Sequence, residues 1–356
     1  MKQFAPIIIP ACSRPLHIKK CIESLARNTY ADKTDLIISV DYPPYDDMME
    51  GYNKVVTFLS GEINGFKSVE IIFQKENLGF YDNIDFLTDL VKKRGYKTFI
   101  YSEEDLEFSP CFLEYINKGL ELFENDERVF SICGYMSENS DETKSNNIEE
   151  VYAFSPWGYG TWVDRYYHII EQITKENFGD LLAKKEIRQL ACNRGDEFRF
   201  LFEATVTQPG KLAGVYNRYY NKRGELGHID QTIGPIMCLE KMFSIHPKVN
   251  MVRNMGFDDK SGHTIICNGL VEYSKQMITE EKRFNYVLNA DLVVQKNDYS
   301  NIEISYMPAK RAWMLRKMYL MNFKWVVRIV LYISYKIGKM RSYIVGYGKE
   351  SYSWRL

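Results

Sequence analysis

The sequence has no apolar run long enough to cross a lipid bilayer. A transmembrane helix needs about 18–20 consecutive apolar residues, and no stretch of this 356-residue chain approaches that length without a charged residue. The first three residues lead directly into a strand-like segment, so we expect no secretory signal. Together these absences predict that the body of the protein lies in the cytoplasm.

Cysteine and histidine are sparse and poorly grouped. The seven cysteines are odd in number, and none forms a Cys-x-x-Cys pair. This pattern favours free, packed thiols in a reducing compartment over a disulfide framework. Of the five histidines, only His263 follows a cluster of acidic residues, which argues against a zinc site built from protein ligands alone.

The net charge of −1 conceals a basic C-terminal segment on an acidic body. Residues 301–356 contain eleven Lys and Arg against two Glu, and residues 308–341 contain nine basic residues and no acidic ones. Aromatic and aliphatic residues alternate with these charges, which predicts an amphipathic helix on an anionic membrane surface. A helix packed on the rest of the protein is the alternative. The high apolar content and the acidic body argue against nucleic acid as a partner.

Four short apolar runs near the N-terminus are spaced by about thirty residues. The segments between them include 16–28 and 80–94, which have helical periodicity, and this alternation is typical of βαβ units with a parallel sheet. Ligands of such sheets bind beyond the carboxyl ends of the strands. The runs are 6–10, 35–41, 68–73 and 97–101, and the residues that follow them are 13–14, 41, 77–79 and 102–107.

The segment after the fourth run, Tyr101-Ser-Glu-Glu-Asp-Leu-Glu107, contains four carboxylates in five positions. Such carboxylates repel one another unless solvent or a cation separates them. In an extended chain Glu103, Asp105 and Glu107 would share one face. A hard divalent cation prefers these oxygens, and a diphosphate would complete its coordination. A solvated acidic turn is the alternative.

The order of these motifs resembles the nucleotide-sugar domain of GT-A glycosyltransferases. Similarity extends over residues 4–264 and is greatest to bacterial family-2-like enzymes and the N-acetylglucosaminyltransferase I branch. The resemblance implies an α/β GT-A fold, in which helices flank a mostly parallel, Rossmann-like sheet, here with a C-terminal amphipathic helical extension. The motifs are Pro6-Ile-Ile-Ile-Pro10 with Ser13-Arg14-Pro15, Ile38-Ser39-Val40-Asp41, Glu76-Asn77-Leu78-Gly79 and Glu103-Glu104-Asp105-Leu106-Glu107.

The resemblance implies a role for each motif in binding the donor. Arg14 would contact its base or diphosphate, and Asp41 would hydrogen-bond a uracil ring. The turn from Asn77 to Gly79 would bring backbone close to the nucleotide. Taken by themselves, these residues have alternative interpretations as a surface arginine, a strand-end cap and a helix-start turn.

The resemblance also implies that Asp105 binds Mn²⁺ or Mg²⁺, while Glu103 and Glu104 reach the ribose or metal-bound water. The family more often has Asp where Glu104 stands. In the loop 256–264, His263 is a candidate metal ligand and Lys260 a candidate phosphate partner. A surface histidine is the alternative interpretation of His263.

An inverting transfer needs a carboxylate that takes the proton from the acceptor hydroxyl. Asp230 is the favoured candidate because it opens a helical segment, 231–242, where the family has its base; a helix N-cap is the other interpretation. Asp196 and Glu197 are further candidates. The motif Trp157-Gly-Tyr-Gly-Thr-Trp162 would form an aromatic wall for a sugar, or alternatively pack in the core.

These observations predict a peripheral membrane enzyme that transfers a hexosyl or N-acetylhexosaminyl group from a nucleotide-diphosphate sugar, with a UDP-sugar favoured. The acceptor would be a cell-envelope glycan or a lipid-linked glycan on the inner face of the cytoplasmic membrane. A nucleotidyltransferase and an inactive GT-A-like scaffold are the alternatives, although 11–15 lacks the glycine-rich basic signature of the former. The expected division is 1–125 for the nucleotide-sugar half, 126–265 for the acceptor half, 266–307 for a connecting region of unassigned role and 308–356 for the tail.

Overall fold

The computed structural model describes residues 3–135, 147–151, 154–172, 230–256 and 277–288, together with Val326 and Ile329. The chain divides into two compact units, and the first consists of residues 1–173, 220–255 and 276–296. Nearly all described residues belong to this first unit. No helix among the described residues is long and apolar enough to span a membrane.

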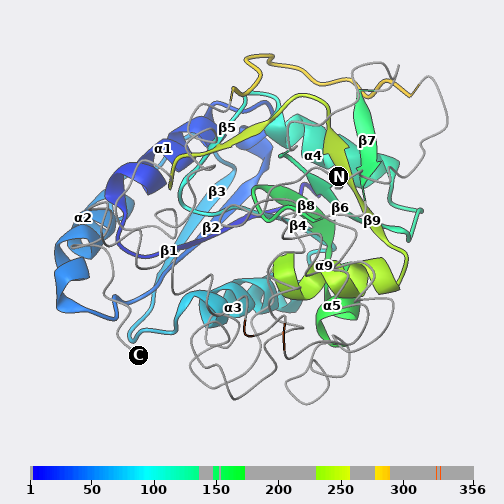
Figure 1. Cartoon of the computed structure of the whole chain (residues 1–356). Helices are drawn as coiled ribbons and strands as arrows, with labels where there is room; N and C mark the ends of the chain where they lie inside the picture. Colours follow the sequence, from blue (N-terminus) through cyan, green and yellow to red (C-terminus); the bar gives the residue numbers. More distant parts are fainter. Residues whose placement is uncertain are drawn as a thin grey trace. The chain divides into compact units, whose positions relative to one another are not determined.

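Within the described ranges, eight strands form one mixed sheet in the order β3-β2-β1-β4-β8-β6-β9-β7 (Figure 1). The first four strands in this order pair in parallel, as do β6 and β9, whereas β8 and β7 run antiparallel to their neighbours. The mostly parallel sheet predicted from the sequence is therefore confirmed. The strands are β1 (Ile7–Ala11), β2 (Asp35–Val40), β3 (Ser68–Phe73), β4 (Thr98–Tyr101), β6 (Val129–Cys133), β7 (Ile148–Val151), β8 (Tyr159–Trp162) and β9 (Phe243–Pro247).

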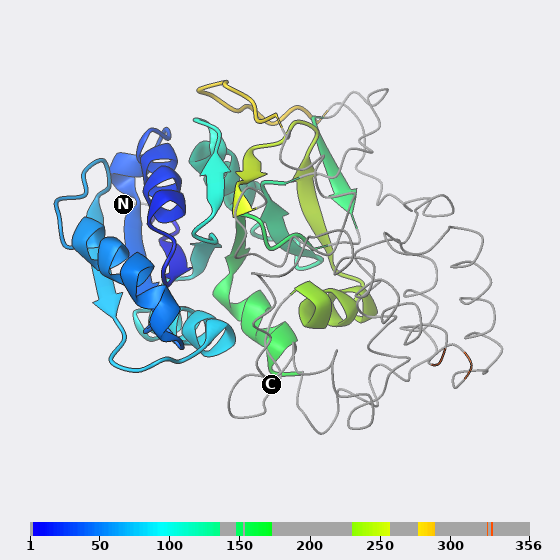
Figure 2. The same ribbon diagram turned by 60° about the vertical axis from the view of Figure 1, so that its left-hand side comes forward.

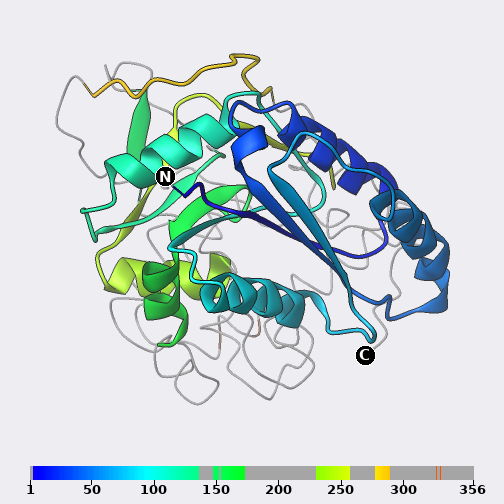
Figure 3. The ribbon, with the colours of Figure 1, turned by 180° about the vertical axis from the view of Figure 1, so that it is seen from behind.

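Helices cover both faces of this sheet. In Figures 1 and 3, α1 and α4 lie over one face, and α3, α5 and α9 lie over the other; Figure 2 shows α1 and α2 side by side. Ile7 and Ile9 belong to the apolar cluster that contains α1, whereas the buried Ile8 points to the opposite face, because strand side chains alternate. The described helices are α1 (Pro15–Ala26), α2 (Met49–Leu59), α3 (Phe80–Lys93), α4 (Phe112–Leu122), α5 (Val163–Ile170) and α9 (Asp230–Leu239), with short 3-10 turns η1 (Ala31–Lys33) and η2 (Asp46–Met48).

The aromatic-glycine motif lies in the centre of the sheet. Tyr159 and Trp162 are buried in β8, which pairs with β4 and β6. A Cβ on Gly160 would lie 2.3 Å from a methyl carbon of Ile116, so α4 packs directly on the strand and requires glycine there. The prediction that this motif walls a sugar is wrong for Tyr159 to Trp162, because these residues form part of the core.

A smaller sheet lies beside the acidic motif. Within the described ranges it pairs β5 (Leu106–Phe108) with β10 (Val252–Asn254) in antiparallel register. Beyond β10, the backbone N–H of Met255 donates to the carbonyl of Asp105 at 2.8 Å. This pairing holds the segment after β9 next to the end of β4, although the two are about 150 residues apart in sequence.

Residues 277–288, called the strap here, lie along α4 without regular secondary structure (Figure 1). The buried carboxylate of Glu114 accepts hydrogen bonds from the backbone of Phe284 at 2.9 Å and from Arg283 at 3.1 Å, and it also pairs with Lys118. The ring of Tyr286 stacks on Tyr115, with centroids 5.6 Å apart. The strap is thus an integral part of the first unit.

Candidate functional site

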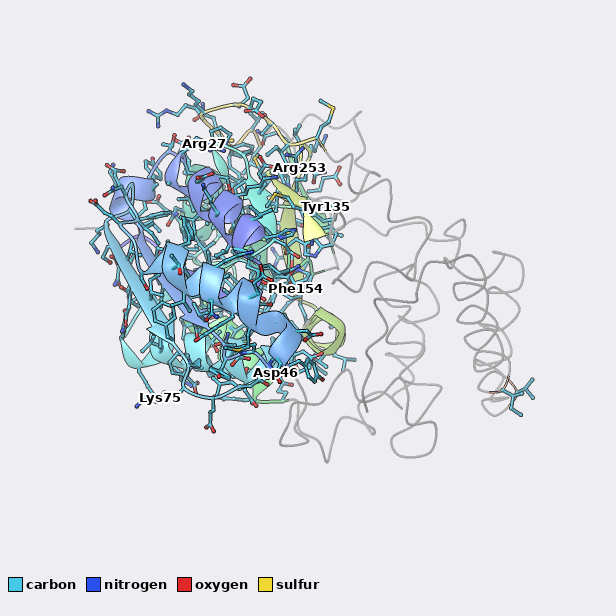
Figure 4. The ribbon with its side chains drawn as sticks, turned by 90° about the vertical axis from the view of Figure 1, so that its left-hand side faces the viewer. Arg27, Asp46, Lys75, Tyr135, Phe154 and Arg253 are labelled. Atoms are coloured by element: carbon cyan, nitrogen blue, oxygen red, sulfur yellow. The ribbon has the colours of Figure 1, made fainter. Side chains whose placement is uncertain are left out.

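The carboxyl ends of β1, β2 and β4 meet at one edge of the large sheet. Ala11 pairs with Val40, and Ile8 pairs with Tyr101. The next residues continue this alignment, because Asp41 N–H donates to Ala11 at 2.8 Å and Ser102 N–H donates to Ile8 at 3.0 Å. In Figure 4, Asp46 and Lys75, which follow β2 and β3, lie at the same lower end of the molecule. The sequence motifs are therefore gathered as predicted.

Arg14 joins this edge to the acidic motif. Its Nε donates to Glu104 Oε1 at 2.6 Å, and its Nη1 donates to Asp105 Oδ2 at 2.8 Å. Glu104 and Asp105 are both buried residues, and Glu104 Oε2 also accepts from the backbone of Cys12 at 2.9 Å. Burial lowers the pKa of Arg14, but the two carboxylates outweigh it and hold the guanidinium charged.

One oxygen of Asp105 has no hydrogen-bond partner in the part of the chain that the structure describes. Oδ1 is buried and has no partner among the described residues. A buried carboxylate oxygen without a donor is costly, and a divalent cation would satisfy it, since hard cations prefer oxygen ligands. Over the described ranges, no three His, Cys, Asp or Glu side chains are grouped to hold a metal. The site therefore fits a cation held by one carboxylate, with other ligands supplied from outside these residues.

The expectation that Glu103, Asp105 and Glu107 share one face is wrong. β4 ends at Tyr101 and the chain turns at Glu104 and Asp105, so the strand alternation is broken. Glu107 instead lies on β5 and pairs with Arg253 on β10, whose Nε lies 3.0 Å from Oε2; Arg253 is labelled in Figure 4. Glu103 is partly exposed beside the turn. The carboxylates brought together are those of Glu104 and Asp105.

Asp41 organises the loop before α3. Its Oδ1 accepts from the backbone of Leu78 at 2.7 Å, and its Oδ2 accepts from Gly79 at 2.9 Å and from the side chain of Asn77 at 2.8 Å. Gly79 has φ +89°, a conformation that side chains disfavour, and stands at the start of α3. The contacts of Asp41 are therefore those of a cap, which was the alternative interpretation. The same hydrogen bonds hold the Asn77–Gly79 turn beside the end of β2.

Sequence reasoning missed three residues at this edge. Tyr42, which follows Asp41, is 38% exposed, and its ring lies 5.6 Å from that of Tyr52 on α2. Burial and the neighbouring Tyr42, Cys12 and Asp41 raise the pKa of Tyr52, which indicates that its hydroxyl is near these groups. A Cβ on Gly51 would lie 2.2 Å from the Ser13 carbonyl. Gly51 lets α2 approach the end of β1, and this glycine was the sequence signal from which the neighbouring Tyr52 could have been found.

Cys12 is predicted to react slowly although it is partly exposed at the site. Burial, followed by the charges of Glu104 and Asp41, raises its pKa to about 12. Because the thiolate is the nucleophile, alkylation by iodoacetamide below pH 9 should be about a thousandfold slower in native than in unfolded protein. Mass spectrometry of the Cys12 peptide across pH 7–11 would measure this. Equal rates in native and urea-unfolded samples would contradict it.

Several predicted site residues cannot be compared with the described geometry. Asp230 is the first residue of α9, as its helix-opening position predicted, but its side chain is not described. Asp196, Glu197, Lys260 and His263 lie outside the described residues. Their roles stay predictions.

The family comparison covers the part of the chain that builds this edge. Residues 1–155 match the profile of the GNT-I family, and they contain Arg14, Asp41, the 77–79 turn and the acidic motif. Over these residues the chain is similar to the GNT-I family. The resemblance seen in the motifs is thereby confirmed. No curated protein sequence gave a significant match.

Solved structures give more distant likenesses to this chain. TarS of S. aureus matches with 13% identity and a TM-score of 0.31, over 49% of this chain and 31% of that one. The mannosyltransferase PcManGT of Pyrobaculum calidifontis, in complex with GDP-Man and Mn²⁺, matches with 9% identity and a TM-score of 0.35, over 68% and 70%. A cytidylyltransferase of Leptospira borgpetersenii matches with 12% identity and a TM-score of 0.28, over 48% and 66%. The match thus spans less than a third of the TarS chain.

Proposed function

We propose that this protein is a metal-dependent glycosyltransferase that moves a sugar from a nucleotide-diphosphate donor, with a UDP-sugar favoured, to a glycan or lipid-linked acceptor. The observation that carries the proposal is the buried Glu104–Asp105 pair, bridged by Arg14 at the carboxyl edge of a GT-A sheet. The similarity of residues 1–155 to the GNT-I family supports the same conclusion. Carboxylates beside a fixed cation suit a ligand that carries both metal and phosphate.

In this proposal Asp105 holds Mn²⁺ or Mg²⁺, with Oδ1 as the available ligand atom. When bound, the cation would neutralise charge on the leaving diphosphate. Arg14 would bind phosphate oxygens, because its guanidinium stays charged and presents several donors. Asp41 would act by holding the 77–79 backbone in place, where Gly79 permits close approach of a ligand. Glu103 and Glu104 would orient the ribose or bound water.

We assign the general base to Asp230, with Asp196 and Glu197 as the other candidates. Asp230 stands at the start of α9. From α9 the chain continues through β9 to β10, and β10 pairs with β5, which contains the end of the acidic motif. As the family resemblance implies, Lys260 is proposed as a phosphate partner and His263 as a metal ligand. Transfer with inversion follows from a base on the acceptor side.

We further propose that residues 308–341 bind an anionic membrane surface and hold the enzyme near a lipid-linked acceptor. The nine basic residues without an acidic one support this, since each basic residue near such a surface contributes about 1 kcal/mol. The location would be the cytoplasmic face of the membrane, with the product a cell-envelope polysaccharide.

The test of the proposed function is nucleotide release from a panel of UDP-, GDP- and TDP-sugars, measured with Mn²⁺ and with EDTA. We expect release of one nucleoside diphosphate that EDTA abolishes and Mn²⁺ restores, because the carboxylate site needs the cation to bind the diphosphate. Release of pyrophosphate from a nucleoside triphosphate and a sugar phosphate would instead identify a nucleotidyltransferase. Absence of both turnover and nucleotide binding would favour a scaffold.

A further inference from the structure

The Arg14 guanidinium occupies the carboxylate that the proposed function assigns to the metal. Asp105 Oδ2 accepts from Nη1, and Glu104 Oε1 accepts from Nε, so one cation spans both groups. The two carboxylates are buried in adjacent positions of one turn. Two such charges would repel strongly without a counter-ion. Arg14 therefore compensates charge that a divalent cation would also compensate.

The Arg14 side chain faces solvent on one side. It is 25% exposed, whereas the two carboxylate side chains are each 9% exposed. Arg14 lies just before α1, at the N-cap, and makes no side-chain capping bond there. Moving the guanidinium therefore breaks its ion pairs without disturbing the start of the helix.

We propose that Arg14 is an internal counter-ion of Asp105: a divalent cation on Oδ1 and the guanidinium on Oδ2 repel each other, so binding of the cation moves Arg14 off the carboxylate. It rests on the proposed function, because it places the cation on the same carboxylate. The ion pairs compete with the cation when no nucleotide is present, so the protein binds metal alone weakly. A metal–diphosphate complex brings negative phosphate oxygens, which receive the displaced guanidinium. Arg14 thus opposes binding of the bare cation and favours binding of the complex.

The proposal predicts that one substitution changes the affinities for Mn²⁺ and for UDP in opposite directions. In Arg14→Gln, Mn²⁺ alone should bind at least about tenfold more tightly, since an ion pair worth about 1.4 kcal/mol no longer has to be broken. In saturating Mn²⁺, UDP should bind at least about tenfold more weakly, because a charged donor to phosphate is lost. Arg14→Lys should show the first effect in smaller degree, since an ammonium cannot span both carboxylates.

The experiment measures Mn²⁺ binding by electron paramagnetic resonance, and UDP binding by calorimetry, on the full chain. Arg94→Gln is the matched control, because Arg94 pairs with Glu70 on the exposed surface; both affinities should match the parent. The double variant Arg14→Gln, Asp105→Asn should lose the tightened Mn²⁺ binding, which locates the cation. Circular dichroism checks folding, and Arg14→Lys serves as the test if Arg14→Gln does not fold.

Unchanged or weaker Mn²⁺ binding in the Arg14 variant, tightened binding that persists without Asp105, or no Mn²⁺ binding to either protein would each overturn the proposal. These outcomes are distinguishable from failure of the proposed function. Replacement of Arg14 by the cation on Asp105 is measured by binding alone, without turnover, whereas the panel of nucleotide sugars reports on sugar transfer. If the cation replaces Arg14 on Asp105 but no sugar is transferred, the metal-binding site stands and the proposed transferase function is wrong.

Discussion

Asp105→Asn is expected to lower kcat for sugar transfer by about a thousandfold or more. The asparagine keeps the shape of the side chain but loses the charge that would bind the cation, and metal stabilisation of a leaving diphosphate is worth several kcal/mol, with a tenfold loss of rate for each 1.36 kcal/mol. The residual rate should no longer respond to Mn²⁺. Steady-state assays with the best donor from the nucleotide-sugar panel, at increasing Mn²⁺, measure both quantities.

The matched control is Glu107→Gln, two positions later in the same motif. Glu107 lies on β5 and pairs with Arg253 on the other strand of the small sheet, so its charge serves a partly exposed ion pair. Such pairs contribute about 0–1 kcal/mol, and kcat should change less than about threefold. Equal losses in the two variants would contradict a specific role for Asp105 and indicate that the acidic motif acts only through its total charge.

Asp41→Ala is expected to destabilise the fold by about 3 kcal/mol, because the donors that now bond to its buried carboxylate would be left without a partner. The side chain is 5% exposed and accepts from Leu78, Gly79 and Asn77. Urea unfolding, followed by circular dichroism in the absence of nucleotide, measures the free energy of unfolding. The loss should appear without any donor present, because the bonds are within the protein.

Asp46→Ala is the control for Asp41, because Asp46 is an exposed carboxylate beyond the same strand. Its removal should change the free energy of unfolding by less than about 0.5 kcal/mol. A protein with Asp41→Ala that is as stable as the parent, but binds UDP weakly, would show that Asp41 acts on the uracil ring as the family resemblance implies, and not through the loop.

The strands and helices of the nucleotide half were predictable because their signals are local. Parallel strands buried on both faces, such as β1 and β2, produce short, nearly continuous apolar runs, and the run over 68–73 was predicted with the bounds that β3 has. Pro15 marked the first turn of α1, where its missing N–H costs little. The carboxyl-edge rule then indicated which loops would meet, before any contact was known.

The contacts within the site were less predictable, because they join residues far apart in sequence. Arg14 meets its two carboxylates across 90 and 91 positions, and Glu107 meets Arg253 across 146. No periodicity signals which of four neighbouring carboxylates takes an arginine. The turn at Glu104 and Asp105 defeated the alternation argument, since two residues outside a strand no longer follow its period.

The strap limits how far the protein can be shortened. A fragment that ends at residue 265, the predicted end of the acceptor half, would omit Arg283 and Phe284, which hold the carboxylate of Glu114. It would also uncover Tyr115, which is fully buried and stacks on Tyr286. A piece of this chain that keeps these contacts must therefore extend at least through Tyr286, so residues beyond the predicted acceptor half contribute to the stability of the unit that carries the site.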